Sequence, residues 1–163
     1  MHIAIIFYSF SGNTKKACEF IKTEFVKQNH GVDVIELKLK TEEKSFMRQG
    51  NAAHYRQTPE IVNTEYDLAK FDLVVFASPV WAFTFTPALR TYIGSCTGLE
   101  GRKTAVFLTC GAAITSGNAL KELEGILRNK GANITFAAFV AGNKTKNLVY
   151  LADIFKKLFS NSL

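Results

Sequence analysis

Short runs of apolar, often β-branched residues recur along the chain, each bounded by polar or small residues. Within a run the apolar positions are nearly continuous rather than alternating, which is typical of parallel strands that helices cover on both faces. The pattern therefore predicts buried strands at five places. The runs are Ile3–Tyr8, Val32–Leu37, Leu73–Ala77, Thr104–Leu108 and Ile134–Val140.

Between most of these runs, apolar residues recur at the three- and four-residue spacing of an amphipathic helix. Thr86 and Pro87 have the form of a helix N-cap and first helical residue. We expect the apolar faces of these helices to pack in the core. They are Ala17, Ile21 and Phe25; Ala88, Leu89, Tyr92, Ile93 and Cys96; Leu120, Leu123, Ile126 and Leu127; and Leu148, Leu151, Ala152, Phe155 and Phe159.

The alternation of strands and helices predicts an α/β fold, with an open parallel sheet between two layers of helices. Right-handed crossovers limit the topology, and five strands favour the order 2-1-3-4-5. In such sheets a ligand binds at the carboxyl ends of the first and third strands, where the strand order reverses. At 163 residues the chain is expected to form a single domain, residues 1–163.

The segment from Thr41 to Thr64 has no clear period and is polar. Connections of this length without structure are uncommon and tend to be functional or disordered. Residues Glu42–Arg48 could form a short helix. Four basic side chains could recognise an anionic substrate or partner here, or they could be solvated charges of a loop. These are Lys44, Arg48, His54 and Arg56.

The residues between the first strand and the first helix have the chemistry of an anion site. The segment is Ser9-Phe10-Ser11-Gly12-Asn13-Thr14. Backbone N–H groups and the helix dipole favour negative charge at a helix N-terminus, and hydroxyl and amide groups add donors. Gly12 permits positive φ and close approach of a ligand. The same residue types also serve as ordinary caps and turns, and the segment matches neither a Walker A loop nor GxGxxG.

Two further loops are predicted at the same edge of the sheet. The loop Ser78–Thr86 contains Trp81, Phe83 and Phe85, and aromatic side chains in a surface loop suggest stacking on a flat ring. The alternative is that these rings pack over a helix as a small cluster. After the fourth strand, Thr109-Cys110-Gly111 is small enough for backbone amides to reach a planar ligand, although Gly111 could simply turn the chain.

With these three loops in order, the chain resembles the flavodoxin family over nearly its whole length. The first loop is similar to that family's (S/T)-x-(S/T)-G-N-T loop, and the uninterrupted last strand is similar to the short-chain form. The resemblance implies a flavodoxin-like three-layer sandwich with FMN as its cofactor. It implies phosphate contacts from Ser9, Phe10, Ser11, Gly12, Asn13 and Thr14, and flavin-ring contacts from Ser78, Pro79, Val80, Trp81, Ala82, Phe83, Thr109, Cys110 and Gly111.

The resemblance leaves two functions open. It implies first an electron carrier that passes electrons between redox partner proteins. The alternative is an FMN-dependent oxidoreductase that takes electrons from NAD(P)H and reduces a quinone or another small acceptor. The chain departs from the family in its net charge of +6, where carriers are typically acidic. It also lacks the aspartate or tyrosine often found in the third loop, where Ala112, Ala113 and Ile114 stand instead.

Composition excludes several other classes. The basic residues are scattered, so nucleic-acid binding is not expected, and no apolar stretch is long enough to span a membrane. Without a basic segment before the first apolar run, we expect no secretory signal and a cytoplasmic protein. The three cysteines and three histidines have no metal-like spacing, and no nucleophile or acid–base pair stands out. Cys110 could be reactive but is more typical of a packed small residue.

Overall fold

The structure is a computed structural model that describes residues 1–41, 45–63, 65–111 and 117–161. Its central feature is a parallel sheet with the strand order β2-β1-β3-β5-β6. Counted among the parallel strands, this is the predicted order 2-1-3-4-5. The strands are β1 (His2–Phe7), β2 (Gly31–Glu36), β3 (Leu73–Trp81), β5 (Lys103–Cys110) and β6 (Asn133–Ala141).

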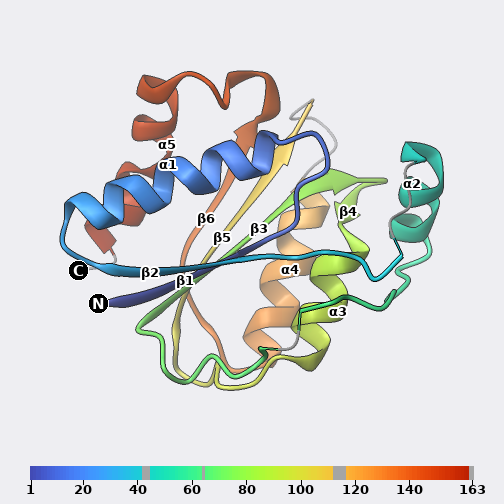
Figure 1. Ribbon diagram of the computed structural model, residues 1–163, viewed down its shortest axis with the longest axis horizontal. Coiled ribbons are helices and arrows are strands. Elements are labelled where there is room, and N and C mark those ends of the chain that lie inside the picture. Colours follow the sequence, from blue (N-terminus) through green and yellow to red (C-terminus); the bar gives the residue numbers. More distant parts are fainter. Residues whose placement is uncertain (42–44, 64, 112–116, 162–163) are drawn as a thin grey trace.

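Helices cover both faces of the sheet, as Figure 1 shows. Helices α1 (Asn13–Lys27) and α5 (Leu148–Asn161) lie on one face, and α3 (Pro87–Ser95) and α4 (Gly117–Asn129) lie on the other. The short helix α2 (Phe46–His54) lies at the end of the molecule where the strands have their carboxyl ends. A 3₁₀ turn, η2 (Gly142–Lys144), connects β6 to α5. The predicted three-layer α/β architecture is confirmed.

Strand β1 shows why the apolar runs are continuous. Ile3, Ile5 and Phe7 pack with α1 and α5, whereas Ala4 and Ile6 pack with α3 and α4. Because successive side chains of a strand point to opposite faces, a strand covered on both sides needs apolar residues at every position. The strand predicted at Val32–Leu37 is present as β2, but it is not buried as predicted, because among the described residues β2 pairs only with β1 and exposes Asp33 and Val34 at the edge of the sheet.

Two helices differ from their predictions. The helix expected at Glu42–Arg48 begins later, at Phe46, because Ser45 accepts the N–H of Arg48 and caps it; residues 42–44 lie outside the described residues. In α5, Leu151 and Phe155 are buried as predicted, but Leu148 and Ala152 are exposed. Ala152 follows Leu151 by one position, so it points about 100° away from the packed face.

The predicted surface loop after the third strand is instead part of the sheet. Strand β3 continues to Trp81, turns at Ala82 and Phe83, and pairs antiparallel with β4 (Thr84–Phe85). We call residues 78–86 the β3–β4 hairpin. The predicted N-cap Thr86 and first helical residue Pro87 of α3 follow it directly. The hairpin carries the chain from the sheet edge back to the start of α3.

Candidate functional site

The loop between β1 and α1 forms a turn that opens the helix N-terminus. Gly12 is the N-cap residue of α1 and has a φ of 82°, in the left-handed region that glycine adopts without strain. The hydroxyl oxygen of Ser9 accepts a hydrogen bond from the N–H of Lys15 at 3.2 Å. The Lys15 ammonium itself bonds the Glu36 carboxylate at 2.8 Å, which raises the pKa of Lys15. The lysine is therefore turned towards β2 rather than over the loop.

The side chains of Asn13 and Thr14 point into the protein rather than out of it. The Thr14 hydroxyl is buried and lies 2.8 Å from the Thr109 hydroxyl at the end of β5. The Asn13 amide oxygen accepts from the Thr145 hydroxyl at 3.4 Å, and its amide nitrogen packs against Gly142. These contacts hold the first loop against the ends of β5 and β6. They bring together residues that are 95 and 132 positions apart in sequence.

The base of the β3–β4 hairpin is a buried hydroxyl pair. Ser78 is fully buried, and its hydroxyl oxygen accepts the N–H of Thr86 at 3.0 Å. The Thr86 hydroxyl lies 2.9 Å from the same oxygen, and Ser78 donates to the carbonyl of Pro79 at 2.9 Å. Thr86 is thus the N-cap residue of α3, but among the described residues its side chain makes no cap hydrogen bond and its hydroxyl bonds Ser78 of the hairpin instead.

The aromatic residues of the hairpin do not form the exposed group that the sequence predicts. Phe85 is fully buried in the core, and Trp81 is only 7% exposed. The Trp81 ring meets Tyr8 and Phe10 edge-on, each with centroids 5.7 Å apart. Strand pairing explains the change, because β4 pairs with β3, buries both of its residues and places Phe85 in the core cluster that includes residues of α3. Phe83 alone of the three is exposed, at 61%.

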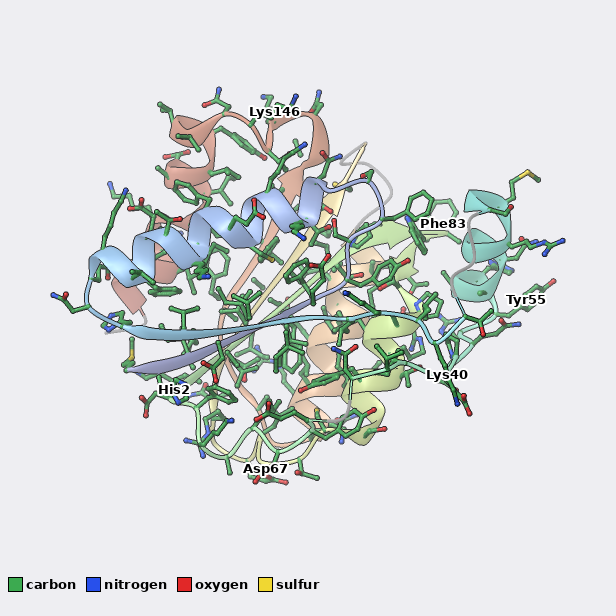
Figure 2. All side chains as sticks on the ribbon, viewed as in Figure 1. His2, Lys40, Tyr55, Asp67, Phe83 and Lys146 are labelled. Carbon is green, nitrogen blue, oxygen red and sulfur yellow. The ribbon has the colours of Figure 1, made fainter. Side chains whose placement is uncertain are left out.

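The tip of the hairpin is strained. Ala82 has a φ of 44° and Phe83 a φ of 66°. Positive φ at both central residues of a two-residue hairpin is normally supplied by Asn-Gly or Gly-Gly, because other L-residues resist it. The tip therefore stores backbone strain while presenting Phe83 to solvent. Figure 2 shows Phe83 beside α2, at the end of the molecule where the strands terminate.

The third predicted loop begins where the first is anchored. Thr109 is buried against Thr14, Cys110 is half-buried and Gly111 is exposed. The next residues, 112–116, lie outside the described residues, and they include Ala112, Ala113 and Ile114, at which the sequence departs from the flavodoxin pattern. The carboxyl ends of β1, β3 and β5 are neighbours in the sheet, so all three predicted loops start at the same edge.

The basic residues of the segment between β2 and β3 do not act as one group. Arg48 lines a cavity of about 230 Å³ together with Tyr8 and Trp81. His54 and Arg56 line another cavity, of about 440 Å³, beside the tip of the hairpin. Lys44 lies outside the described residues.

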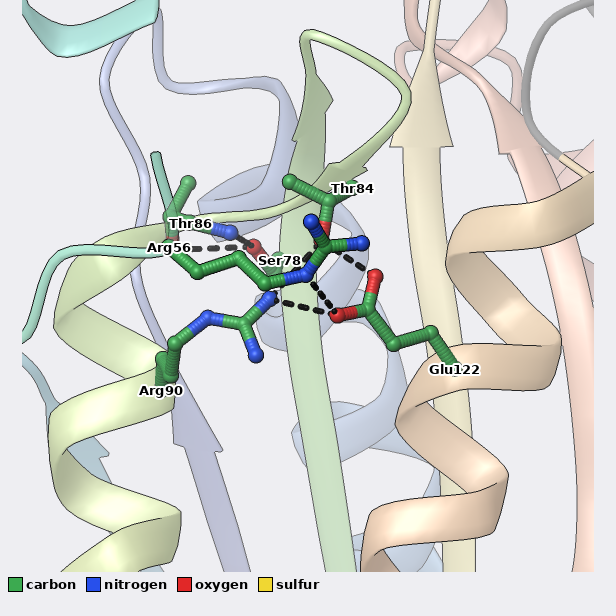
Figure 3. A network of polar contacts seen from close by, with 6 residues as sticks. All are labelled: Arg56, Ser78, Thr84, Thr86, Arg90 and Glu122. Carbon is green, nitrogen blue, oxygen red and sulfur yellow. Dashed lines mark hydrogen bonds and ion pairs between the residues drawn. The ribbon is translucent and has the colours of Figure 1, made fainter. Parts of the chain in front are cut away.

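Sequence reasoning missed a polar cluster that braces the hairpin, which Figure 3 shows. The Glu122 carboxylate of α4 accepts from the Thr84 hydroxyl at 2.7 Å, Arg90 of α3 at 2.9 Å and Arg56 at 3.0 Å. Burial raises the pKa of Glu122, but these hydrogen bonds outweigh it and hold the pKa below its usual value. The Arg90 guanidinium also lies 4.2 Å over the Phe85 ring. No spacing signal marks such a cluster, because its members come from four separate segments.

Two absences concern the described residues only. Across residues 1–41, 45–63, 65–111 and 117–161, there is no group of three or more His, Cys, Asp or Glu side chains that could hold a metal ion. No helix within the same ranges combines the length and apolar character needed to cross a bilayer.

Comparison with known proteins identifies the family. The family described as NADPH-dependent FMN reductase matches residues 1–146. The chain belongs to that family. The FMN reductase family assignment makes the chain an FMN-binding, flavodoxin-like flavoprotein, which confirms the cofactor that the sequence predicts.

Solved structures share the fold of this FMN reductase family member at low sequence identity. A flavoprotein from Lactobacillus acidophilus NCFM, in complex with FMN, is 22% identical, with a TM-score of 0.69 over 91% of this chain and 98% of that one. Oxidised flavodoxin 2 from Bacillus cereus is 17% identical, with a TM-score of 0.67 over 98% of this chain and 99% of that one. Two-electron reduced Megasphaera elsdenii flavodoxin is 15% identical, with a TM-score of 0.61 over 92% and 97%. A search of curated proteins finds no significant match.

Proposed function

We propose that this chain is an FMN-dependent oxidoreductase that takes electrons from NADPH and passes them to a small acceptor such as a quinone. The observation that carries the proposal is the open cavity at the tip of the β3–β4 hairpin, which is lined by His54 and Arg56 and lies next to the edge of the sheet where the three loops begin. The description of the chain's family, NADPH-dependent FMN reductase, also names NADPH. Bound FMN would accept the electrons of NADPH and release them to the acceptor.

The first loop suits the phosphate of FMN. In the described part of the chain, the N–H groups of Gly12, Asn13 and Thr14 donate to no acceptor. A Cβ added at Gly12 would meet no atom of the described residues within 4 Å, so these residues leave the space over this turn open. Unpaired donors at a helix N-terminus form a ready anion site. These facts support Ser9, Phe10, Ser11, Gly12, Asn13 and Thr14 as the phosphate-binding residues.

The other two loops would hold the flavin ring. On this proposal the ring lies between the hairpin residues Pro79, Val80, Trp81, Ala82 and Phe83 on one side and Cys110 and Gly111 on the other, with the buried Ser78 and Thr109 beneath these residues. The buried contacts beneath both loops support it, because Ser78–Thr86 and Thr14–Thr109 hold the backbone in place before a ligand arrives. The Trp81 ring, packed against Tyr8 and Phe10, would exclude water from one edge of the site.

A second candidate is the electron carrier that the flavodoxin resemblance implies. The exposed rings of Phe10 and Phe83 at the same end of the molecule favour it, because exposed aromatic side chains are common in protein interfaces. On this alternative a redox partner protein, rather than NADPH, would deliver the electrons.

Anaerobic stopped-flow reduction separates the two functions. FMN is added to the purified protein, excess is removed, and bleaching of the flavin band is followed after mixing with NADPH. Complete bleaching in seconds by NADPH alone supports the oxidoreductase. Slow bleaching by NADPH alone, with fast bleaching once a flavodoxin reductase is added, would contradict it and favour the carrier. The Gly12→Ala variant serves as the binding control and should retain less FMN, because a Cβ at φ 82° is strained and lies in the ligand's space.

A further inference from the structure

The cavity beside the hairpin tip, here called the tip cavity, is lined by two basic side chains and one carboxylate. Its volume is about 440 Å³, and its lining includes His54, Arg56, Phe83, Thr84, Asn118 and Glu122. These residues come from the end of α2 and the residues just after it, the hairpin and the first turns of α4. The family assignment does not give a role to any of them.

The charges do not cancel in the polar cluster to which Arg56 and Glu122 of the tip cavity belong, although Arg90 of that cluster does not line the cavity. Arg56 and Arg90 both bond the same carboxylate oxygen of Glu122, at 3.0 and 2.9 Å, while the other oxygen accepts from Thr84. Two guanidinium groups on one carboxylate leave one positive charge without a counter-charge in this cluster. Arg90 is packed over Phe85 with a side chain only 13% exposed, so it cannot reach a ligand.

Arg56 is the group that can present this charge to a ligand. Its side chain is 63% exposed, and among the described residues only its Nε is engaged, by Glu122. Figure 3 shows its guanidinium held at the centre of the cluster by that bond. The two terminal amino groups of the same plane remain available as donors. A fork of this kind, fixed at Nε, matches the oxygens of a phosphate.

The backbone at Arg56 is unfavourable for arginine. Arg56 follows the last turn of α2 with a φ of 50°, and its N–H bonds Ala53 while that of Gln57 bonds Ala52. This is the Schellman ending, whose left-handed residue is usually glycine. Helix termination therefore does not explain an arginine here, whereas its contact with Glu122 and its place in the tip cavity do.

We propose that Arg56, assisted by His54, binds the 2′-phosphate of NADPH and makes this chain select NADPH over NADH. The inference rests on the proposed oxidoreductase function and names the residue that sets its nucleotide preference. The 2′-phosphate is the group by which the two nucleotides differ, and it is an anion that a guanidinium fork can bind with two hydrogen bonds. The exposed Phe83 ring offers an apolar face for a base in the same cavity.

Calorimetric titration of the FMN-loaded protein tests the proposal without turnover. The probes are adenosine 2′,5′-bisphosphate and adenosine 5′-monophosphate, which differ by the 2′-phosphate. Wild type should bind the bisphosphate about 10- to 100-fold more tightly, the range expected for hydrogen bonds to a charged group. R56Q should bind both probes alike. R128Q is the matched control and should keep the preference, because Arg128 is also exposed, at 54%, and paired with a glutamate, but lies outside the tip cavity.

A second variant separates the effect of losing the guanidinium from the effect of the backbone conformation at position 56. R56G relaxes the left-handed backbone, so it should fold at least as well as R56Q and should still lose the preference for the bisphosphate. Equal binding of the two probes by wild type would overturn the inference, as would a preference that survives in R56Q and R56G.

Flavin reduction distinguishes failure of the inference from failure of the proposed function. If NADPH and NADH bleach the flavin of wild type equally fast, the function stands and the role of Arg56 is refuted. If neither nucleotide bleaches the flavin, the oxidoreductase function is refuted, whatever the calorimetry shows. Bleaching by NADPH that R56Q slows at low nucleotide concentration, but not at saturation, supports both.

Discussion

Ala82 at the hairpin tip is the position where backbone strain can be removed most cleanly. Its φ of 44° lies in the left-handed region, where the Cβ of an L-residue costs about 1–2 kcal/mol. Ala82 is exposed, so Ala82→Gly removes no buried contact. Against this gain, glycine gives the unfolded chain freedom that costs about 0.5–1 kcal/mol. We expect the variant to be more stable than wild type by roughly 0.5–1 kcal/mol.

Ala152→Gly is the matched control for this change. Ala152 is also exposed, but it lies inside α5, where the backbone is right-handed. Glycine there should destabilise the protein by about 1 kcal/mol relative to alanine. One chemical substitution at two exposed sites should therefore give effects of opposite sign. In a chain of this size, 1 kcal/mol corresponds to about 2–4 °C in Tm.

Urea and thermal unfolding, followed by circular dichroism without added FMN, measure both variants. The midpoint of Ala82→Gly should rise by about 1–4 °C and that of Ala152→Gly should fall by about 2–4 °C. A fall in both would show that the tip of the free protein does not hold the left-handed conformation, and the reasoning would be refuted. FMN is left out because a ligand that binds the folded state would add its own stabilisation.

Buried polar groups and thiols give three further expectations. Thr109→Val leaves the Thr14 hydroxyl without its 2.8 Å partner, so urea unfolding should show a loss of about 1–3 kcal/mol, and an unchanged midpoint would contradict the bond. The pKa of Glu122 is lowered from its usual value of 4.5, so its carboxylate stabilises the fold fully above that pH and loses this contribution as the pH falls further. Glu122→Gln should therefore reduce the fall of Tm at acid pH, and parallel Tm–pH curves for the variant and wild type would exclude this role of Glu122. Burial raises the pKa of the Cys96 thiol to about 11, so iodoacetamide should react with the half-buried Cys110 before Cys96. Mass spectrometry measures the two labelling rates, and equal rates would contradict this expectation.

The fold was predictable because its signals are local and repeated. Continuous apolar runs mark strands that are buried on both faces, and β1 shows the cause, with Ile5 on one face and Ile6 on the other. Right-handed crossovers then leave few strand orders. The pattern failed at β2 because an edge strand can carry the same β-branched residues as a central one.

The β3–β4 hairpin shows where local signals stop. The sequence Ser78–Thr86 contains no Asn-Gly or Gly-Gly to mark a two-residue turn, so a loop with three exposed rings was the natural prediction. The structure instead accepts strain at Ala82 and Phe83, buries Phe85 and turns Trp81 against Tyr8 and Phe10. Tertiary packing stabilises a turn that its residues disfavour.

By itself, the sequence determined the order of the elements and the edge of the sheet at which the three predicted loops begin, because each depends on neighbouring residues. Only the tertiary structure decided which side chains meet there. Thr14 contacts Thr109, which lies 95 positions away in the sequence. Glu122 binds Arg56, Arg90 and Thr84, and the four residues come from four separate segments. Such contacts depend on how helices dock on the sheet, since distances between docked surfaces are not encoded in the spacing of residues along the chain.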